Sequence, residues 1–447
     1  MKRQIGRYSK YLRPITITFD LLVLVMLGIW LLPLSFQLLY FYLYLAFSWI
    51  VISVITKFYQ VYRFTKLIQI AQKAIKQYFL FGLNLFALNG LFTLTHAYWS
   101  VTNYLLFTAL VIIPVKYLVF YLLKIFRKYY RGNLRKIVVV GHDDLTENFL
   151  KFVTTNADYG YLLCKSFSLL NTPPAEIISY CKEKDIDEIY LSLEKTTTQQ
   201  VSFFINYVDN NLKLLKFLPS KKDLLSANLK VDYYGVIPVM PSRTTPLNDP
   251  VNYFIKRVFD IFFSLFVVVF VMSWLIPLVA LLIRIESKGP IFFKQKRHGL
   301  DYEEFNCYKF RSMFVNEKAD IDEAVKNDPR ITKIGAFLRR TSIDEMPQFF
   351  NVLIGNMSVV GPRPHMLNFT EKYAVKVNKF KARHFIKPGI TGMAQTHGYR
   401  GEIENDTDII NRIKYDIFYM ESWSLLLDVK IIYLTIKNAI KGEKKAY

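Results

Sequence analysis

The sequence predicts a membrane protein of three parts: an N-terminal four-helix transmembrane region (1–130), a central Rossmann-like α/β domain (134–245), and a C-terminal α/β domain (250–447) with a re-entrant membrane helix. Three observations predict this. Hydrophobic residues make up 52% of the 447 residues, yet 58 Lys and Arg stand against 36 Asp and Glu. Long apolar runs are confined to the first quarter and to one later stretch. Between them, strand-like and helix-like segments alternate.

The first quarter contains four apolar runs, each close to the ~20 residues that a bilayer-spanning helix needs. They cover roughly 17–34, 38–56, 78–95 and 102–123. Lys and Arg cluster before the first run, between the second and third, and after the fourth, whereas the other two connections carry none. Because positive charge stays in the cytoplasm, we expect four spans with both ends inside. Buried helices of a soluble protein would not explain this alternation of charge.

The middle region reads as alternating strands and helices, which is typical of βαβ units and a parallel sheet. Its first strand, "RKIVVV", ends in Gly141-His142-Asp143-Asp144. The glycine-rich dinucleotide fingerprint is absent there, and two aspartates would repel phosphate. We therefore expect a structural or regulatory module, with cofactor binding as the weaker alternative. The three cysteines have no paired spacing, which argues against a disulfide framework or a zinc ribbon.

A fifth apolar run, about 258–283, opens the C-terminal region. Its 26 residues carry one charge, Asp260, and would reach about 39 Å as a straight helix. Basic residues flank both ends, so both ends favour the cytoplasm. Pro277 interrupts the backbone hydrogen bonding, and Ser273, one turn earlier, is a candidate partner for a freed carbonyl. We expect a re-entrant helix that bends at Pro277; a plain fifth span is the alternative.

Polar residues beyond this helix suggest chemistry on phosphates. A predicted hairpin around Gly299-Leu300-Asp301 ends in Lys309 and Arg311, two cations on one face of a strand. An Asp344–Glu345 pair follows in "RRTSIDEMPQ". Ser342 and Glu345 fit a helix capping box, which is the simplest interpretation of this fragment alone.

The context of the pair favours another interpretation. Arg339 and Arg340 precede it, Pro347 follows, and two Pro/Gly loops, "GPRP" and "KPGITGMAQ", lie within fifty residues. Carboxylates beside guanidinium groups suit Mg²⁺–phosphate substrates, and an Asp can attack phosphorus and carry the group covalently.

These segments resemble a known family. "KRVFD", "GPIFFKQKRHG", "YKFRSM", "LRRTSIDEMPQFFNVLIGNMSVVGPRP", "RHFIKPGITGMAQ", "GYRGE" and "YDIFYMESWSLLLDVKII" occur in the order found in bacterial polyprenyl-phosphate glycosyl-1-phosphate transferases. The likeness covers the last 200 residues, and the whole chain looks like the family's large members, which initiate exopolysaccharide or capsule synthesis. Two positions depart from the pattern: Ile276 precedes the helix proline where Ser is common, and Met393 replaces Trp or Leu.

The resemblance implies a role for each matching residue. Asp344 would attack the β-phosphate of a nucleoside-diphosphate sugar and hold the sugar phosphate, and Glu345 would help bind Mg²⁺ or assist the acceptor. Arg339 would steady phosphate charge. The remaining expected substrate-site residues are Lys309, Arg311, Pro362, Arg363, Pro364, Arg383, Gln395, Arg400 and Asp416.

The implied partners are undecaprenyl phosphate, a nucleoside-diphosphate sugar, expected to be UDP-glucose or UDP-galactose, and the lipids of the bacterial inner membrane. Both termini and the catalytic domain would be cytoplasmic; a homodimer is left open, and nucleic acid is not expected. Two alternatives remain. A membrane-bound nucleotide-sugar dehydratase or epimerase would need a second glycine-fingerprinted domain, which is missing. The other alternative is a non-catalytic scaffold for polysaccharide assembly.

Overall fold

The computed structural model describes residues 9–32, 39–61, 63, 65, 67–91, 98–219, 231–234, 237–243, 245–315, 328–399, 401 and 405–441. The chain forms two compact units. The first comprises Met1–Thr197 and Leu214–Ser242, and the second comprises Thr198–Lys213 and Arg243–Tyr447. The predicted transmembrane region and most of the predicted Rossmann-like module therefore share the first unit.

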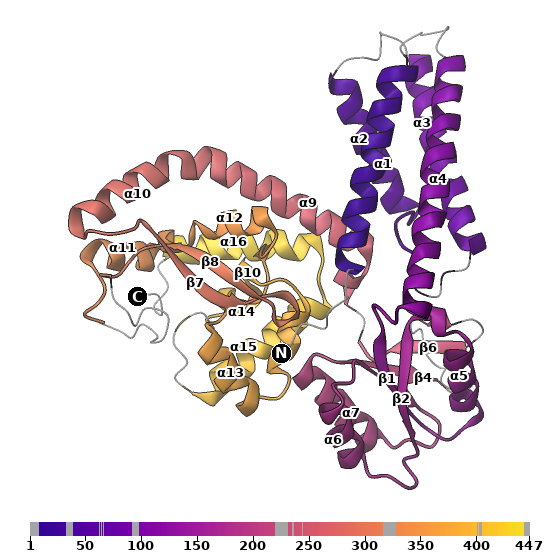
Figure 1. The fold of residues 1–447 in the computed structure, drawn as a ribbon. Coiled ribbons are helices and arrows are strands. Elements are labelled where there is room, and N and C mark those ends of the chain that lie inside the picture. The colour runs from indigo at the N-terminus through magenta and orange to yellow at the C-terminus, as the bar shows by residue number, and fades with distance from the viewer. Residues whose placement is uncertain are drawn as a thin grey trace. The chain divides into compact units, whose positions relative to one another are not determined.

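Four helices begin the first unit (Figure 1): α1 (Ser9–Leu31), α2 (Leu39–Ile55), α3 (Leu67–Leu91) and α4 (Tyr98–Tyr129). Helices α1 and α3 each pack against both α2 and α4. The core combines aliphatic and aromatic side chains, and the Trp49 ring meets Phe58 and Phe81 edge-on at 5.6 and 4.9 Å. Leu12–Leu31 and α4 are long and apolar enough to cross a membrane, and α2 is apolar but shorter. Among the described residues, α3 is not one of the helices that are apolar enough to cross a membrane, so apolar helices are present but the expected four spans stay a prediction.

The rest of the unit is built on a six-stranded sheet in the order β2-β1-β3-β4-β6-β5, as an α/β prediction requires. The strands are β1 (Arg135–Val140), β2 (Tyr161–Phe167), β3 (Glu188–Ser192), β4 (Leu214–Leu218), β5 (Asp232–Tyr234) and β6 (Ile237–Pro241). The first four are parallel, and β6 joins β4 antiparallel. Two helices, α5 (Asp144–Thr155) and α6 (Pro174–Glu183), link the parallel strands on either side of β2.

Open α/β sheets take ligands where the connections diverge, which in this sheet is between β1 and β3. Side chains of the protein meet each other at this place. The Ser192 hydroxyl donates to the Asp143 carboxylate, whose other oxygen accepts from the Thr146 amide at 2.7 Å. A Cβ on Gly141 would lie 2.5 Å from Thr146 Oγ1 and 2.8 Å from Ser192 Cβ. Asp143 thus serves as the cap of α5 rather than facing an open phosphate site.

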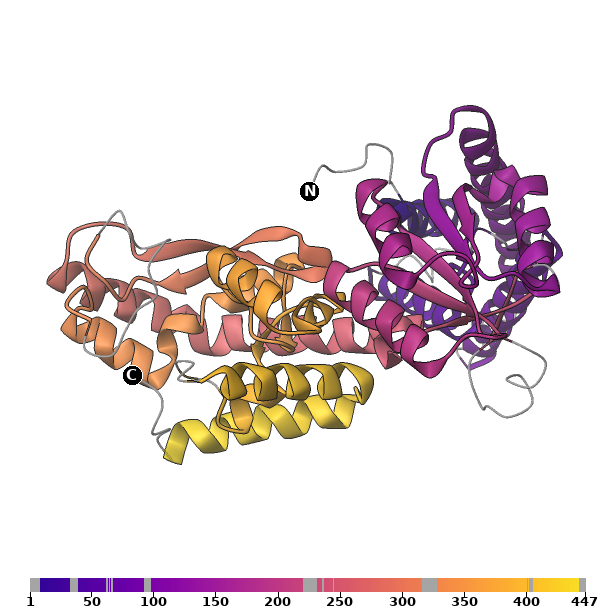
Figure 2. The ribbon, with the colours of Figure 1, turned by 90° about the horizontal axis from the view of Figure 1, so that it is seen from below.

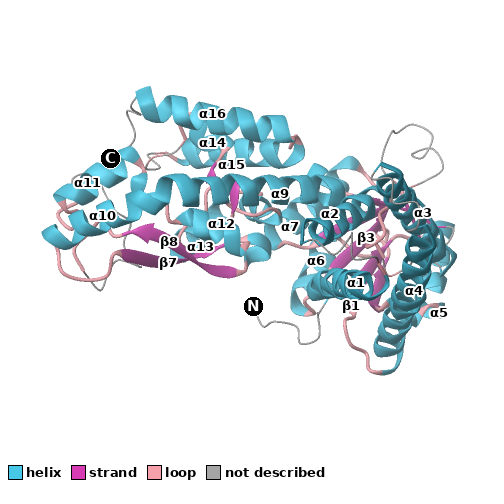
Figure 3. Cartoon of the chain, turned by 90° about the horizontal axis from the view of Figure 1, so that it is seen from above, coloured by secondary structure: helices cyan, strands magenta, loops and turns pink. Residues whose placement is uncertain are grey.

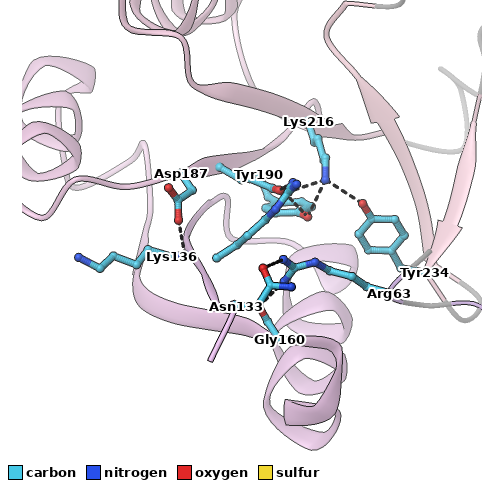
Figure 4. Close-up of polar contacts among 10 residues, drawn as sticks. Arg63, Asn133, Lys136, Gly160, Asp187, Tyr190, Lys216 and Tyr234 are labelled. Atoms are coloured by element: carbon cyan, nitrogen blue, oxygen red, sulfur yellow. Dashed lines mark hydrogen bonds and ion pairs between the residues drawn. The ribbon is translucent and has the colours of Figure 1, made fainter. Parts of the chain in front are cut away.

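A buried polar cluster organises the opposite end of the sheet, where Lys216 donates to the Tyr190 and Tyr234 hydroxyls (Figure 4). At its centre, Glu188 pairs with Arg135 and, at 2.6 Å, with Lys216, and it accepts from the Tyr190 hydroxyl at 2.9 Å. Burial alone would raise the pKa of Glu188, but Lys216 and Arg135 hold the pKa at about 2. Beside this cluster, Arg63 from the α2–α3 connection donates to the Gly160 carbonyl at 2.8 Å. The helices and the sheet are therefore joined by polar contacts.

In the second unit, α9 (Pro250–Val267), a π-helical turn (Val268–Met272) and α10 (Ser273–Glu286) form one curved apolar helix of 37 residues, long enough to cross a membrane (Figure 1). The helix continues through Pro277, and Ser273 is exposed. A proline clashes with the carbonyl four residues earlier, and the widened π turn just before that position accommodates the change. The irregularity thus lies earlier than the expected bend.

One stripe of this helix is buried along its whole length. The buried residues are Lys256, Asp260, Ser264, Val267, Met272, Leu275, Val279 and Ile283. The helix runs between the hairpin of β7 (Phe292–His298) and β8 (Glu304–Phe310) and α16 (Leu425–Lys441), as the views from below and above both show (Figures 2 and 3). The predicted hairpin is therefore confirmed.

The remaining elements of the unit are mostly short. They are α7 (Thr198–Asn211), α11 (Lys333–Thr341), α12 (Gln348–Ile354), β9 (Ser358–Val360), α13 (Leu367–Lys376), β10 (Gly389–Thr391), α14 (Met393–Thr396), α15 (Asp406–Glu421), and the 3₁₀ turns Pro246–Asn248, Leu300–Tyr302, Ile343–Glu345 and Phe380–Phe385.

The Glu188 cluster yields a stability prediction. Glu188→Gln leaves Arg135 and Lys216 uncompensated and should lower the free energy of unfolding at pH 7 by about 3 kcal/mol, the low end for a buried pair because Arg135 is 35% exposed. Since the folded pKa lies below the ordinary 4.5, the wild type loses this contribution as the pH falls from about 4.5 towards 2.

Urea unfolding followed by circular dichroism at pH 7 and pH 3 measures both effects. Glu183→Gln, at an exposed position on α6, is the matched control and should change little. Equal unfolding free energies for Glu188→Gln and the wild type at pH 7 would contradict the prediction.

Candidate active site

The acid pair lies in a 3₁₀ turn, Ile343–Glu345, between α11 and α12. Ser342 ends α11 in the left-handed conformation, with φ +60°, and its side chain does not cap the turn. The capping-box interpretation is therefore wrong: the left-handed residue reverses the chain, and a new turn begins after it. Asp344 and Glu345 are both buried, with exposed fractions of 7% and 6%. Two adjacent carboxylates are thus held away from water.

Cations surround Glu345. Arg363 binds it with both guanidinium arms, Nη2 to Oε1 at 2.6 Å and Nη1 to Oε2 at 3.1 Å. Lys309 of β8 approaches Oε1 at 3.3 Å. A bidentate arginine fixes a carboxylate in position as well as in charge. The structure therefore brings together the basic strand, the "GPRP" loop and the acid pair, as the sequence suggested.

Asp344 is in a less favourable electrostatic environment. Its burial raises its pKa above the ordinary 3.8, and the neighbouring Glu345 raises it further, while Lys309 and Arg339 act in the opposite direction. Arg339 is half-buried on α11, so its charge reaches Asp344. A carboxylate whose charge is poorly stabilised is more basic and more reactive than one in water.

The two Pro/Gly loops hold each other by close backbone contact. A Cβ on Gly389 would lie 2.0 Å from the Gly361 amide nitrogen, and one on Gly392 would lie 2.3 Å from the Gly361 carbonyl oxygen. The Gly389 amide donates to Pro362 O at 2.9 Å. Strand β9, which ends just before Gly361, pairs in parallel with β10, which begins at Gly389. No side chain fits between these backbones, so glycine is required and the loop carrying Arg363 is fixed.

The same loop is fixed to the long apolar helix. Asp260 accepts from the Val359 amide at 3.1 Å and from the Ser358 hydroxyl at 3.0 Å. One turn earlier, Lys256 donates to Val360 O at 3.1 Å and pairs with Asp428 of α16 at 2.8 Å. Strand β9, which leads directly into Gly361 and Arg363, is thus attached to α9.

A second group of cations lies next to Arg363. Arg383 donates to Arg363 O at 2.7 Å and pairs with Asp416 of α15 at 2.8 Å. The pKa of His365 lies well below 6.5 because of its burial and the charges of Arg383, Arg412, Arg297 and Arg363. This set, which we call the arginine cluster, consists of Arg297, Arg363, Arg383 and Arg412 with His365.

The arginine cluster has unused hydrogen-bonding capacity. Among the described residues, four of its buried nitrogens lack a partner: Arg297 Nε, Arg383 Nη1, Arg412 Nε and His365 Nε2. Buried donors left without partners are costly, so they indicate a place for an anion. Arginine forks bind carboxylate or phosphate oxygens bidentately, so phosphate is a candidate for this place.

The sequence interpretation missed three members of this cluster. Arg412 lies four residues before Asp416, on the same face of α15, and His365 directly follows the Pro-Arg-Pro segment. Arg297 alternates with Gln295, to which it donates at 2.8 Å on the inner face of β7. Helical and strand periodicity could have found Arg412 and Arg297; nothing in the sequence marks His365.

Other expected residues lie elsewhere. The Arg311 guanidinium donates to Ser287 O at 2.6 Å and to Lys288 O at 2.9 Å, so it holds the chain just past α10 rather than touching the acid pair. Gln395 is buried on α14, and its Oε1 lacks a partner among the described residues. Pro277 and Ser273 belong to α10, and Arg400 lies outside the described residues.

We expect the arginine cluster to bind pyrophosphate. In the wild type, binding should raise the melting temperature, with a stabilisation of about 2.7 kcal/mol when the ligand is at a hundred times its Kd. Arg412→Gln should reduce the shift in melting temperature, because it removes one guanidinium. Lys372→Gln, which removes an exposed cation from α13, is the control. Identical shifts in wild type and Arg412→Gln would show that pyrophosphate binds elsewhere.

Comparison with known proteins places this site in a family. The family described as bacterial sugar transferase matches residues 251–442. A UDP-glucose:undecaprenyl-phosphate glucose-1-phosphate transferase of Klebsiella pneumoniae is 38% identical over 279 residues, 61% of this chain and 58% of that protein. The protein of the same name in Xanthomonas campestris is 39% identical over 280 residues, 61% of this chain and 57% of that protein. The chain thus spans a little over half the length of these relatives.

A third relative is matched almost completely. The exopolysaccharide production protein PSS of Rhizobium leguminosarum is 43% identical over 195 residues, which are 42% of this chain but 97% of that protein. The part of this chain that the family matches, residues 251–442, carries the acid pair, the Pro/Gly loops and the arginine cluster. The chain therefore belongs to the bacterial sugar transferase family.

Proposed function

We propose that this protein transfers a hexose 1-phosphate from a UDP-hexose, such as UDP-glucose or UDP-galactose, to undecaprenyl phosphate, and so initiates the synthesis of an exopolysaccharide, capsule or O-antigen. The observation that carries the proposal is the buried Asp344–Glu345 pair between Lys309, Arg363 and the arginine cluster. The names of the Klebsiella and Xanthomonas relatives support this reaction. A relative from Erwinia amylovora is named a UDP-galactose-lipid carrier transferase, which supports galactose as well as glucose.

The reaction takes two displacements at one phosphorus atom. First, an oxygen of Asp344 attacks the β-phosphorus of the UDP-hexose, and the bond to the leaving phosphate of uridine monophosphate breaks. Second, the phosphate oxygen of undecaprenyl phosphate attacks the same phosphorus and breaks its bond to Asp344. The product is undecaprenyl-diphospho-hexose, and the carboxylate is restored.

The surrounding cations have complementary roles in this proposal. The buried environment of Asp344 disfavours its free negative charge, which favours attack. Arg363 and Lys309 hold Glu345 and leave Asp344 as the nucleophile. The arginine cluster offers its unpartnered nitrogens to the diphosphate and to the departing phosphate. No proton transfer is needed, because both attacking groups are already anions.

Magnesium fits this donor set. Among the described residues, no three His, Cys, Asp or Glu side chains gather as a metal site. One or two carboxylates with substrate phosphates are nevertheless what Mg²⁺ prefers, so Asp344 would hold it, and Glu345 would add only the lone pairs that Arg363 and Lys309 leave. The ion would neutralise phosphate charge.

The substrate lipid requires the site to face a membrane. We place α1–α4 across the bacterial inner membrane with both ends in the cytoplasm, and α9–α10 as a re-entrant helix in its inner leaflet. The continuous buried stripe of α9–α10 supports this placement. Other parts of the second unit pack against the helix from end to end, as expected for a helix that does not cross the membrane. The outer side of the helix exposes large apolar residues: Phe262, Phe266, Phe270, Trp274, Leu278 and Leu281.

The covalent step has a direct test. Asp344→Asn should lower transfer by at least roughly a thousandfold, because the amide is a poor nucleophile. Membranes carrying the wild type or the variant are incubated with undecaprenyl phosphate and a panel of sugar nucleotides, and nucleoside monophosphate release is measured. Asp406→Asn, at an exposed position on α15, is the control and should retain full activity. Full activity in Asp344→Asn would refute the role of Asp344 as the nucleophile.

The pH dependence tests the electrostatics of Asp344. Since burial and Glu345 raise its pKa, activity should fall on acidification with a midpoint above 3.8. Lys309 lowers this pKa, so Lys309→Met should move the acidic midpoint of kcat/KM to higher pH. Lys294→Met, which removes an exposed cation from β7, should leave it unchanged. A midpoint that moves down or stays in place in Lys309→Met would contradict this assignment.

A further inference from the structure

One helix of the central region is attached to the active-site elements. Helix α7 connects β3 to β4 in the chain, yet it belongs to the second unit. We propose that α7 positions the arginine cluster, with Asn210 holding the turn that carries Arg383 and Asp209 holding the helix that carries Arg412 and Asp416. This inference rests on the proposed function, because it assigns α7 a role in binding the sugar nucleotide.

Asn210 contacts the turn that leads to Arg383. Its Oδ1 accepts from the Lys379 amide at 2.6 Å, and its Nδ2 lies 3.4 Å from Asn378 Oδ1. Lys379 adopts the left-handed conformation, with φ +64°, which a residue with a side chain adopts only at a cost. The bond from Asn210 thus stabilises a backbone conformation that is unfavourable by itself.

The turn is rigidly coupled to Arg383. The Lys379 carbonyl accepts from the Ala382 amide at 3.1 Å, which begins the 3₁₀ turn Phe380–Phe385. The next residue, Arg383, is 2% exposed and holds both Arg363 O and Asp416. A buried side chain with two fixed partners has little room to readjust, so a change at Lys379 should reach the guanidinium.

The neighbouring residue of α7 makes a second attachment. Asp209 accepts from Arg243 Nη2 at 3.1 Å, and Arg243 Nε lies 3.6 Å from Glu421. Glu421 is the last residue of α15, the helix that carries Arg412 and Asp416. Two consecutive residues of α7 therefore reach both of the elements that supply Arg383, Arg412 and Asp416.

The effect should be confined to the sugar nucleotide. The arginine cluster is where the diphosphate is expected to bind, whereas Asp344 lies on the separate Ile343–Glu345 turn, whose Glu345 is held by Lys309 and by Arg363 of the cluster. Loss of one hydrogen bond at Lys379 should raise KM for the sugar nucleotide roughly three- to tenfold, with kcat within about twofold. Asn210 is thus a positioning residue.

The experiment compares four full-length proteins: wild type, Asn210→Ala, Asn210→Asp and Asn211→Ala. Asp keeps the acceptor for the Lys379 amide, so it should restore KM to near the wild-type value. Among the described residues, the Asn211 side chain donates within α7, to Tyr207 O at 2.8 Å, so its alanine variant is the matched control. Hydrogen exchange at the amides of 379–385 is measured alongside, since it does not depend on activity.

In Asn210→Ala we expect faster exchange at 379–385 and a raised KM, and neither change in the other two variants. Unchanged exchange in Asn210→Ala would overturn the inference, as would faster exchange with an unchanged KM. A KM that Asn210→Asp fails to restore would also overturn it. If even the wild type releases no nucleoside monophosphate from any sugar nucleotide, the proposed function fails, while the exchange data still decide whether Asn210 holds the turn.

Discussion

Two carboxylates buried side by side impose the main constraint on this protein. Adjacent negative charges away from water are unfavourable unless cations compensate them, and those cations must come from distant parts of the chain. Lys309 comes from the hairpin and Arg363 from the loop after β9, and the bidentate Arg363 contact fixes Glu345 in one position. The close packing of Gly361, Gly389 and Gly392 can be understood as the support that this arginine requires.

The same need for compensation explains the surrounding layer. Arg383 holds the carbonyl of Arg363, and Asp416 holds Arg383, so each charge near the site has a fixed neighbour. The cations still exceed the carboxylates, and within the described part of the chain several buried nitrogens of the cluster lack a partner. A surplus of this kind is unfavourable by itself, and the phosphates of the proposed substrate would compensate it. The uncompensated positive charge of the folded protein would therefore contribute to its affinity for the diphosphate.

Local sequence patterns predicted much of this arrangement, and long-range packing determined the rest. Alternating hydropathy located the sheet and the hairpin, and basic flanks marked the apolar helices. The backbone at Ser342 was not predictable, because its left-handed conformation follows from how α11 and α12 pack. Arg311 is a similar case: strand alternation places it beside Lys309, but its guanidinium meets carbonyls 23 and 24 residues away in the chain, and its expected role at the substrate stays a prediction. Periodicity tells which side a residue faces, not what it meets there.

The attachment of β9 to α9 has a consequence for how the site would meet the proposed lipid substrate. Lys256 and Asp260 lie one turn apart, and both hold the three-residue strand that leads to Arg363. With α9–α10 in the inner leaflet as proposed, this double attachment sets the height of the catalytic carboxylates above the acyl chains. A thicker or thinner bilayer would then carry helix and site up or down together. The reacting phosphorus would therefore stay at a constant depth relative to the membrane surface.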